Sequence, residues 1–330
     1  MKISPGRRAI LAAALAASVA LPLLVRGTLF EYTIRMFGIM GLYVILALGL
    51  NITLGLVGLF DLGFMAFYAI GAYTSALLSI HGWGFLPSTV AAVVVTVFFR
   101  VCLGAPVLRL KGDYLAVVTL GFGEITRLVL NNWDGMTNGP KGLPRVGQSI
   151  GSITFFGFEF NENIHFYYLI LAVVVLTVGV SKRLENSRIG RAWTAVREDE
   201  IAAELSGVPV TRVKMLAFAT SAIFAAIAGS LFVYWEQFVT PESFTFWESV
   251  LVVSMIVLGG MGSVTGVILG AILISGLPLF LQATMGGEAI HYRYLIFGLA
   301  LVIIVIFRPQ GLVPSRRRAL ELEAQETPAA

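Results

Sequence analysis

The sequence predicts an all-α protein that crosses a membrane about ten times. Three observations lead to this prediction. Hydrophobic residues make up 57% of the 330 residues and charged residues only 13%, mean hydropathy is +0.86, and the apolar residues gather in long runs. Soluble domains carry about 25% charged residues. A chain with so few charges has more apolar surface than a soluble core can bury. A single cysteine, Cys102, and the absence of a Gly-X-Y repeat exclude disulfide-based and collagen-like proteins.

Each apolar run is taken as one span, because a helix needs about 20 residues to cross the hydrocarbon core. The predicted spans are 9–25, 36–56, 58–80, 86–108, 113–130, 164–181, 213–235, 244–258, 263–283 and 291–307. A cleaved signal peptide is the alternative for 9–25. That run is long for a signal sequence and Arg26 follows it directly, so we expect it to be retained.

Basic residues fix the predicted orientation. They cluster before residue 9, at Arg109 and Lys111, within 182–214, and from Arg308 to Arg318. Ten crossings bring all these clusters to one side, which the positive-inside rule makes cytoplasmic. Both termini are then cytoplasmic and the loop 131–163 is external. The bases lie beside apolar runs and form no groove with exposed aromatics, so nucleic acid is not an expected partner.

Two regularities are typical of transporters. Segments 36–130 and 213–307 each hold four spans, but one set starts outside and the other inside, as in two inverted four-helix repeats. Glycines interrupt both sets, at Gly55, Gly58 and Gly63 and at Gly259, Gly260, Gly262 and Gly266. Such breaks indicate either a translocation path near the midplane or close helix packing through small residues. The sequence leaves both readings open.

Charges inside apolar runs are the candidate path residues, because they are costly there and commonly functional. Glu124 and Arg127 are spaced i, i+3 on one predicted helix. They form either a polar patch facing the path or a self-satisfied pair that packs the helix. Asp61 lies in a glycine-rich break, where backbone N–H groups could satisfy it. Arg100 is a further charge within an apolar run, and it could simply snorkel.

No catalytic motif is present. The chain has no P-loop and no HExxH or CxxC, and its three histidines, His81, His165 and His291, are far apart. We therefore expect no enzyme activity, no metal site and no cofactor.

The segment 190–214 is polar but strongly patterned, and it predicts one or two short helices that end at Gly207 and Pro209. Its small apolar face, Ala202, Ala203 and Leu205, has a charged rim of Arg197, Glu198, Asp199 and Glu204. A rigid segment of this kind suits docking into the groove of a partner. Binding to anionic lipid is the alternative, and five acidic residues within 182–214 argue against it.

Several segments carry a resemblance to a known family. Residues 202–207, Ala-Ala-Glu-Leu-Ser-Gly, resemble the E-A-A-x-x-x-G motif of permeases of ATP-binding cassette (ABC) importers, with Ile201 at the usual glutamate position. Together with 190–204, 114–133, 137–142, 257–263 and 307–314, they resemble the M-type permease subunit of branched-chain amino acid (Liv) ABC importers over 36–314. The family often has serine at the position of Asp61 and histidine at that of Phe64. Urea-type permeases tend to have arginine at the position of Met261, so the methionine here favours an amino acid as the substrate.

The resemblance implies a type II importer permease fold in a bacterial inner membrane. The permease domain is 1–314 and 315–330 is a polar cytoplasmic tail. Implied partners are an H-type permease, two cytoplasmic ATPase subunits, membrane lipid and an external binding protein that delivers leucine, isoleucine or valine. The expected ATPase-coupling residues are Arg191, Arg197, Glu198, Asp199, Ala202, Ala203, Glu204 and Gly207, and the expected path residues are Asp61, Glu124, Arg127, Gly259, Gly260 and Gly262.

Three other functions stay open at this point. A urea or amide permease of the same superfamily would share most of the motifs. An ion-coupled secondary transporter could use Asp61 or Glu124 as its coupling group, but it has no need of the 190–214 segment. A membrane structural or receptor component would carry no substrate at all.

Overall fold

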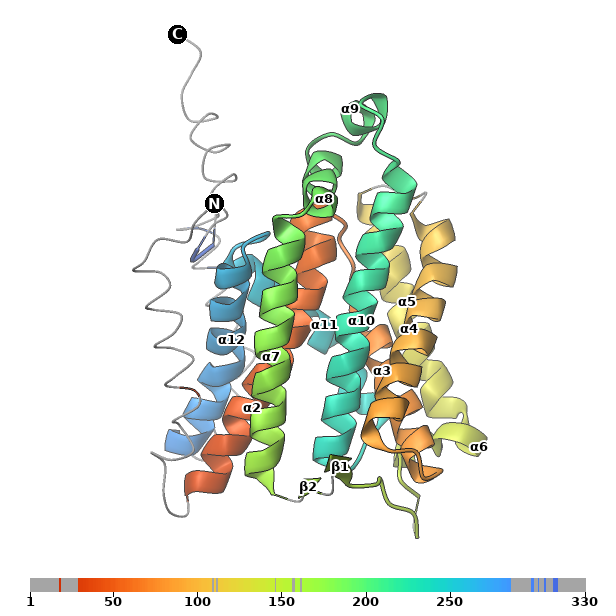
Figure 1. Ribbon diagram of the computed structural model, residues 1–330, viewed down its shortest axis with the longest axis vertical. Coiled ribbons are helices and arrows are strands. Elements are labelled where there is room, and N and C mark those ends of the chain that lie inside the picture. The colour runs from red at the N-terminus through yellow and green to blue at the C-terminus, as the bar shows by residue number, and fades with distance from the viewer. Residues whose placement is uncertain are drawn as a thin grey trace.

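The computed structural model describes residues 29–108, 110, 112–145, 147–155, 158–160 and 162–285, together with residues 18, 298, 299, 302, 306 and 311–313. Over these residues the fold is a bundle of helices with one small hairpin (Figure 1). The hairpin pairs β1 (Ile153–Phe155) with β2 (Phe158–Phe160) in antiparallel register. The predicted spans 9–25 and 291–307 and the tail 315–330 lie outside the described residues, apart from single positions.

Helices make up most of the described part of the chain. In chain order they are α2 (Leu29–Asn51), a π-helix η1 (Ile52–Val57), α3 (Phe64–Ile80), α4 (Phe85–Val107), α5 (Asp113–Asn132), α6 (Asp134–Thr137), a 3-10 turn η2 (Gly139–Lys141), α7 (Asn163–Glu185), α8 (Arg188–Glu198), α9 (Glu200–Leu205), α10 (Val210–Glu236), a 3-10 turn η3 (Pro241–Phe244), α11 (Phe246–Gly259) and α12 (Val264–Met285).

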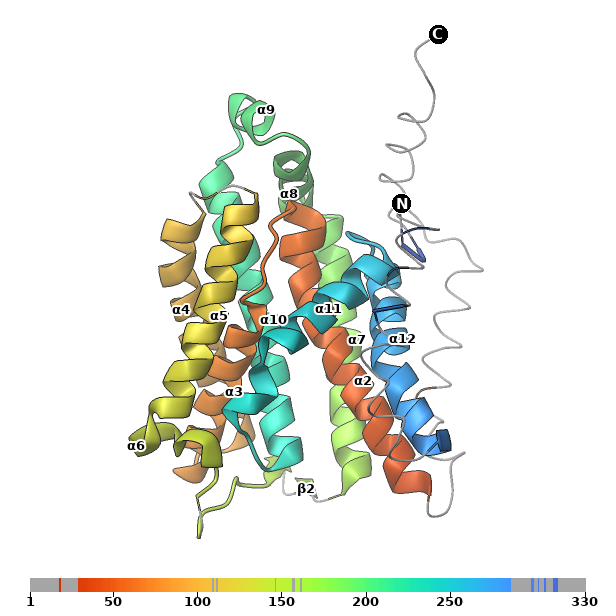
Figure 2. The same cartoon turned by 180° about the vertical axis from the view of Figure 1, so that it is seen from behind.

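Each predicted span between 36 and 283 coincides with a helix of the structure. Among the described residues, six helices are long and apolar enough to cross a membrane, and Phe64–Ile80 and Val264–Leu277 are shorter apolar helices. The prediction was wrong about where the span 58–80 begins. Residues 58–63 are not helical, because Gly58 has φ +79° and the backbone of Thr119 approaches Gly63 too closely for a side chain there. The helix α3 therefore starts at Phe64, part-way along the bundle (Figure 2).

Helices α2 and α10 form the centre of the bundle. Helix α10 packs on α3, α4 and α2, while α2 also packs on α7 and α12, and α11 crosses the bundle obliquely toward α12 (Figure 2). Small residues bring α3 and α10 close together. A Cβ at Gly229 would lie 2.6 Å from the carbonyl oxygen of Tyr68, and one at Gly71 would lie 2.6 Å from the Cα of Ala226. In lipid there is no hydrophobic driving force between helices, so the close van der Waals packing that small residues allow holds the two helices together.

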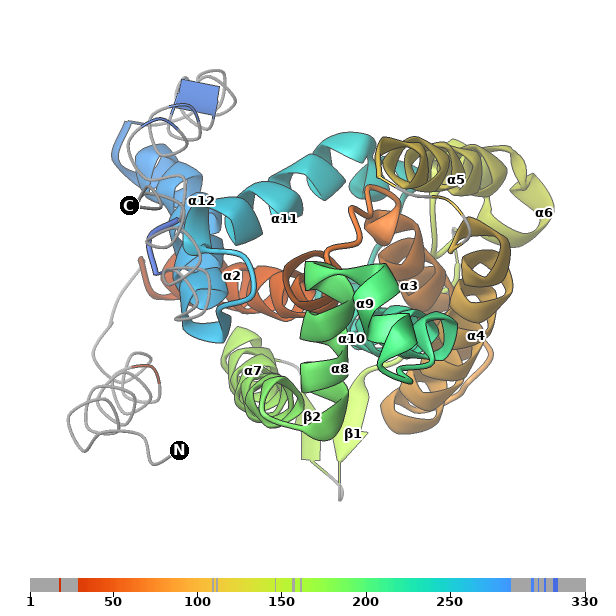
Figure 3. The same ribbon diagram turned by 90° about the horizontal axis from the view of Figure 1, so that it is seen from above.

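The two ends of the bundle differ in character. Helices α8 and α9 project from one end, whereas α6 and the β1–β2 hairpin lie at the opposite end (Figure 1). Seen from above, α8 and α9 cover the end of α10 (Figure 3). The basic segment 182–214 and the loop 131–163 are thus at opposite ends, as the predicted topology requires. The fourth span of the second repeat falls outside the described residues, so the inverted repeat stays a prediction.

Candidate functional site

The α8–α9 knob, residues Arg188–Leu205, is a folded unit rather than a loop. Helix α8 is amphipathic and buries Gly190, Trp193 and Val196. It begins at Ser187, whose Oγ accepts a hydrogen bond from the Gly190 N–H at 3.1 Å. A side chain at Gly190 would collide with the carbonyls that end α7, so this glycine allows the turn from α7 into α8.

Two contacts fix the knob to α10. The fully buried Trp193 donates its indole Nε1–H to the Val213 carbonyl at 2.9 Å. The Lys214 ammonium, also buried, pairs with Glu200 at 2.7 Å at the start of α9. Sequence reasoning singled out neither Trp193 nor Lys214. The signal in the sequence that could have indicated a buried anchor was a tryptophan in an otherwise polar, helical segment, because a tryptophan commonly buries its ring and finds a partner for its N–H.

Helix α9 is capped at both ends. The Asp199 carboxylate accepts from the N–H groups of Ile201 at 2.8 Å and Ala202 at 3.0 Å, which is N-capping. At the other end Gly207 has φ +83°, and the bonds from Gly207 N–H to the Glu204 carbonyl and from Val208 N–H to the Ala203 carbonyl form a Schellman motif. The predicted stop at Gly207 is confirmed, and Asp199 orders the helix instead of only lining its rim.

The apolar face of α9 differs from the one expected. Ala203 is only 4% exposed and belongs to the core, whereas Ile201 is 65% and Leu205 85% exposed. Ala202 is exposed beside them. The expected placement of Ala203 on a contact face does not fit this burial. The surface that α9 offers is Ile201, Ala202 and Leu205, with the exposed Glu198 and Glu204 nearby. Arg191 is exposed on α8 and its Nη1 reaches the Asn186 carbonyl.

Asp61 and Arg100 form a buried ion pair. Both residues are nearly inaccessible to solvent, and the Arg100 guanidinium donates to the Asp61 carboxylate. The guanidinium lies between the Phe67 ring, 4.2 Å from its centre, and the Phe218 ring, at 3.9 Å. Of the interpretations open for Arg100, snorkelling does not apply, because its partner and two aromatic faces stabilise it inside the bundle. Asp61 also accepts from the Gly63 N–H at 3.1 Å, as the sequence suggested.

Glu124 and Arg127 do pair, at 3.0 Å, but Glu242 of η3 also pairs with Arg127 at 3.0 Å. Their side chains are 34%, 23% and 64% exposed respectively. Glu124 lines a small cleft between α3, α5 and α11 with Phe244 and Ser249. The arrangement is therefore a half-exposed triad that ties α5 to η3.

Removing one acid of the triad should have a small effect on stability. Arg127 keeps a partner in either single variant, so Glu124→Ala and Glu242→Ala should each change the free energy of unfolding by less than about 1 kcal/mol. If Glu124 faces the path, only Glu124→Ala lowers uptake at normal membrane abundance, and Glu242→Ala is the matched control. Uptake assays paired with immunoblots of membranes check this. Normal uptake by Glu124→Ala at normal membrane abundance would leave Glu124 with the packing role alone.

The glycines expected to line the path lie in close backbone contacts. Gly259, Gly260 and Gly262 are buried. A side chain at Gly259 would collide with the Gly266 backbone, and Gly262 has φ +79° and lies against Gly55. Close helix packing, one of the two interpretations that the sequence left open, therefore accounts for Gly259. The contact between Gly55 and Gly262 joins the two glycine-rich breaks.

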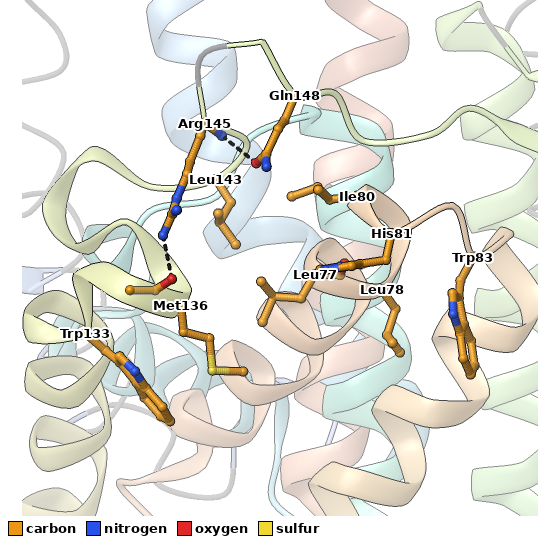
Figure 4. Close-up of a pocket in the computed structure, with 11 residues that line it drawn as sticks. Leu77, Leu78, Ile80, His81, Trp83, Trp133, Met136, Leu143, Arg145 and Gln148 are labelled. Carbon is orange, nitrogen blue, oxygen red and sulfur yellow. Dashed lines mark hydrogen bonds between the residues drawn. The ribbon is translucent and has the colours of Figure 1, made fainter.

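A cavity of about 760 Å³ lies at the end of the bundle opposite to the knob, and no pattern in the sequence indicated it (Figure 4). Its lining includes Trp83, Trp133, Met136, Arg145 and Gln148. The Arg145 guanidinium donates to the carbonyls of Asp134 and Gly135, each at 2.6 Å, which holds the loop before β1 against α6.

The described residues form an apolar helical bundle with buried charges, glycine-broken helices and a polar knob at one end, an organisation that suits a membrane transport protein. The family model described as "Branched-chain amino acid transport system / permease component" matches residues 32–305, so the chain belongs to this family. It is a permease component and not an enzyme. The resemblance stated from the sequence motifs is confirmed.

Curated relatives agree with the family. The chain is 42% identical to the LivM permease proteins of the high-affinity branched-chain amino acid transport systems of Salmonella typhimurium and Escherichia coli K12, over 96% of this chain and 77% of theirs. It is 25% identical to the LivH permease protein of Salmonella typhimurium, over 82% of this chain and 91% of that protein. No solved structure matches the chain.

Proposed function

We propose that the chain is one of two membrane subunits of an ATP-driven importer for leucine, isoleucine and valine. The match to LivM proteins over nearly the whole chain supports the substrate class. Similarity to LivH proteins supports an H-type permease as the second subunit, since two related chains form a pseudo-symmetric pair with the path between them. The fold is then of the type II importer class, with two inverted four-helix repeats.

The observation that carries this proposal is the α8–α9 knob. Trp193 and Glu200 hold the knob to Val213 and Lys214 of α10, and its outer face exposes Ile201, Ala202 and Leu205. Large apolar side chains exposed at the tip of a polar segment are costly in water and suit a buried protein interface. We assign this face to docking of an ATPase subunit, with Arg191, Glu198 and Glu204 at its edge.

The orientation follows from the same assignment. ATP is supplied in the cytoplasm, so the knob faces the cytoplasm, and α6, the hairpin and the cavity near Arg145 face outward. A binding protein would deliver the amino acid at that outer end. Both termini are then cytoplasmic, the permease domain extends over 1–314, and the complex lies in the bacterial inner membrane. Among the expected path residues, the half-exposed Glu124 is the best placed to meet a substrate.

Reconstitution tests the proposal directly. The chain, an H-type permease and two ATPase subunits are assembled in proteoliposomes with the binding protein, and uptake of labelled leucine and urea is measured. We expect leucine uptake that requires ATP and stays when ion gradients are collapsed. Uptake driven by a gradient without ATP would favour the ion-coupled carrier, and urea uptake in place of leucine would favour the urea-type permease.

A further inference from the structure

The two glycine-rich breaks of the chain meet at one point. A Cβ at Gly55 in η1 would lie 2.5 Å from the backbone nitrogen of Gly262. The buried side chain of Asn51 accepts a hydrogen bond from the Gly262 N–H at 2.9 Å. These residues are 211 positions apart in sequence. The end of α2 and the turn between α11 and α12 are therefore directly bonded.

Arg197 reaches this contact from the knob. Its Nη1 donates to the Gly55 carbonyl at 2.6 Å, and its stem packs on Gly58, where a Cβ would lie 2.9 Å from the Arg197 Cγ. The same Nη1 lies near Gly262, 3.4 Å from the position of a Cβ there. We call Asn51, Gly55, Gly262 and Arg197 the junction. Sequence reasoning gave Arg197 a place on the docking rim, but its guanidinium points into the bundle.

The segment that Arg197 contacts has an unusual backbone. Residues 52–57 form a π-helix, all six of them buried, and Gly58 ends it in the left-handed conformation. The Gly58 and Leu59 N–H groups both point to the Thr53 carbonyl. π-Helical turns are rare and commonly mark functional sites. A charged donor on a carbonyl of such a turn is a strong and directional bond, so a displacement of Arg197 acts on η1.

The knob can transmit a displacement because it is held as one body. Trp193 and the Lys214–Glu200 pair tie α8 and α9 to α10, and Arg197 lies on the last turn of α8, two residues before the cap residue Asp199. A shift of α9 therefore changes the position of Arg197 relative to η1.

We propose that Arg197 is a positioning residue that couples the knob to the junction. When the ATPase subunits move α9, the bond from Arg197 to the Gly55 carbonyl moves η1, and the Asn51–Gly262 bond carries the movement to the turn between α11 and α12. Both glycine-broken segments of the chain then shift together. This inference rests on the proposed docking of ATPase subunits on α9.

The test measures leucine taken up per ATP hydrolysed in the full reconstituted complex. Arg197→Ala and Asn51→Ala should each lower this ratio by about tenfold, with the ATPase subunits still co-purifying. The double variant should fall no further than either single one, because both remove the same link. Arg197→Lys keeps a donor for Gly55 and should recover most of the ratio. Arg188→Ala, which removes an exposed guanidinium from the same helix, is the matched control.

The outcomes separate this inference from the proposed function. A wild-type complex whose uptake does not depend on ATP contradicts the proposed function. ATP-dependent wild-type uptake with an unchanged ratio in both Arg197→Ala and Asn51→Ala overturns the junction alone. If Arg197→Ala fails to accumulate in the membrane, the ratio measured for Asn51→Ala decides between the outcomes. This variant removes the bond to the Gly262 N–H, at the side of the junction away from α9. A ratio lowered equally by Arg188→Ala would also overturn the specific role of Arg197.

Discussion

Truncating Arg100 to alanine should lower the free energy of unfolding by about 3–5 kcal/mol, because it leaves the Asp61 carboxylate buried without its counter-charge. Asp61 is 1% and Arg100 2% exposed, so the carboxylate is left in the interior of the bundle. The alkyl stem and guanidinium between Phe67 and Phe218 are lost as well. Thermal unfolding of the detergent-purified protein, together with its yield from membranes, checks this expectation.

Two controls make the test specific. Arg35→Ala removes an ion pair with Glu236 whose side chains are 54% and 23% exposed, and it should cost less than about 1 kcal/mol. The double variant Asp61→Asn with Arg100→Met keeps an oxygen for the Gly63 N–H and an apolar side chain between the two rings. It should recover most of the lost stability, because replacing a buried pair is cheaper than breaking it. If Arg100→Ala costs no more than Arg35→Ala, the pair does not stabilise the bundle.

Introducing tryptophan at Ala202 should detach the ATPase subunits and abolish uptake. Ala202 is exposed between Ile201 and Leu205, so the large ring holds the docked surfaces apart without disturbing α9 itself. We expect the affinity for the ATPase subunits to fall by at least about tenfold, equivalent to about 1.4 kcal/mol. Co-purification from co-expressing cells and leucine uptake measure the effect.

Other substitutions in the knob distinguish docking from folding. Ala202→Ser keeps the surface small and should behave as wild type. Ala203→Trp falls in the core and should unfold α9. At Gly207 the space around a Cβ is open but φ is +83°, so Gly207→Val strains the end of α9 by about 1–2 kcal/mol. Full co-purification and full uptake with Ala202→Trp would mean that the ATPases dock on another surface.

Local patterns predicted a large part of the fold. The apolar runs between 36 and 283 all became helices, because the length and hydropathy of a run are properties of contiguous residues. The knob and its stop at Gly207 were predicted for the same reason, since helix formers, caps and a left-handed glycine act within a few residues of one another. The glycines marked the break before Phe64, but the start of the span 58–80 was misplaced by six residues, because the hydropathy of a run does not show where its backbone becomes helical.

The sequence by itself thus determined which segments are helical, which are polar and where glycines interrupt them. Only the tertiary structure decided which residues far apart in the sequence meet. Arg100 finds Asp61 across 39 positions, Arg127 finds Glu242 across 115, and Arg197 finds Gly55 across 142. Each partner lies on a distant segment of the chain. The packing of the helices sets these contacts, because an apolar stripe specifies that a helix face is buried or lipid-facing but not which neighbour covers it.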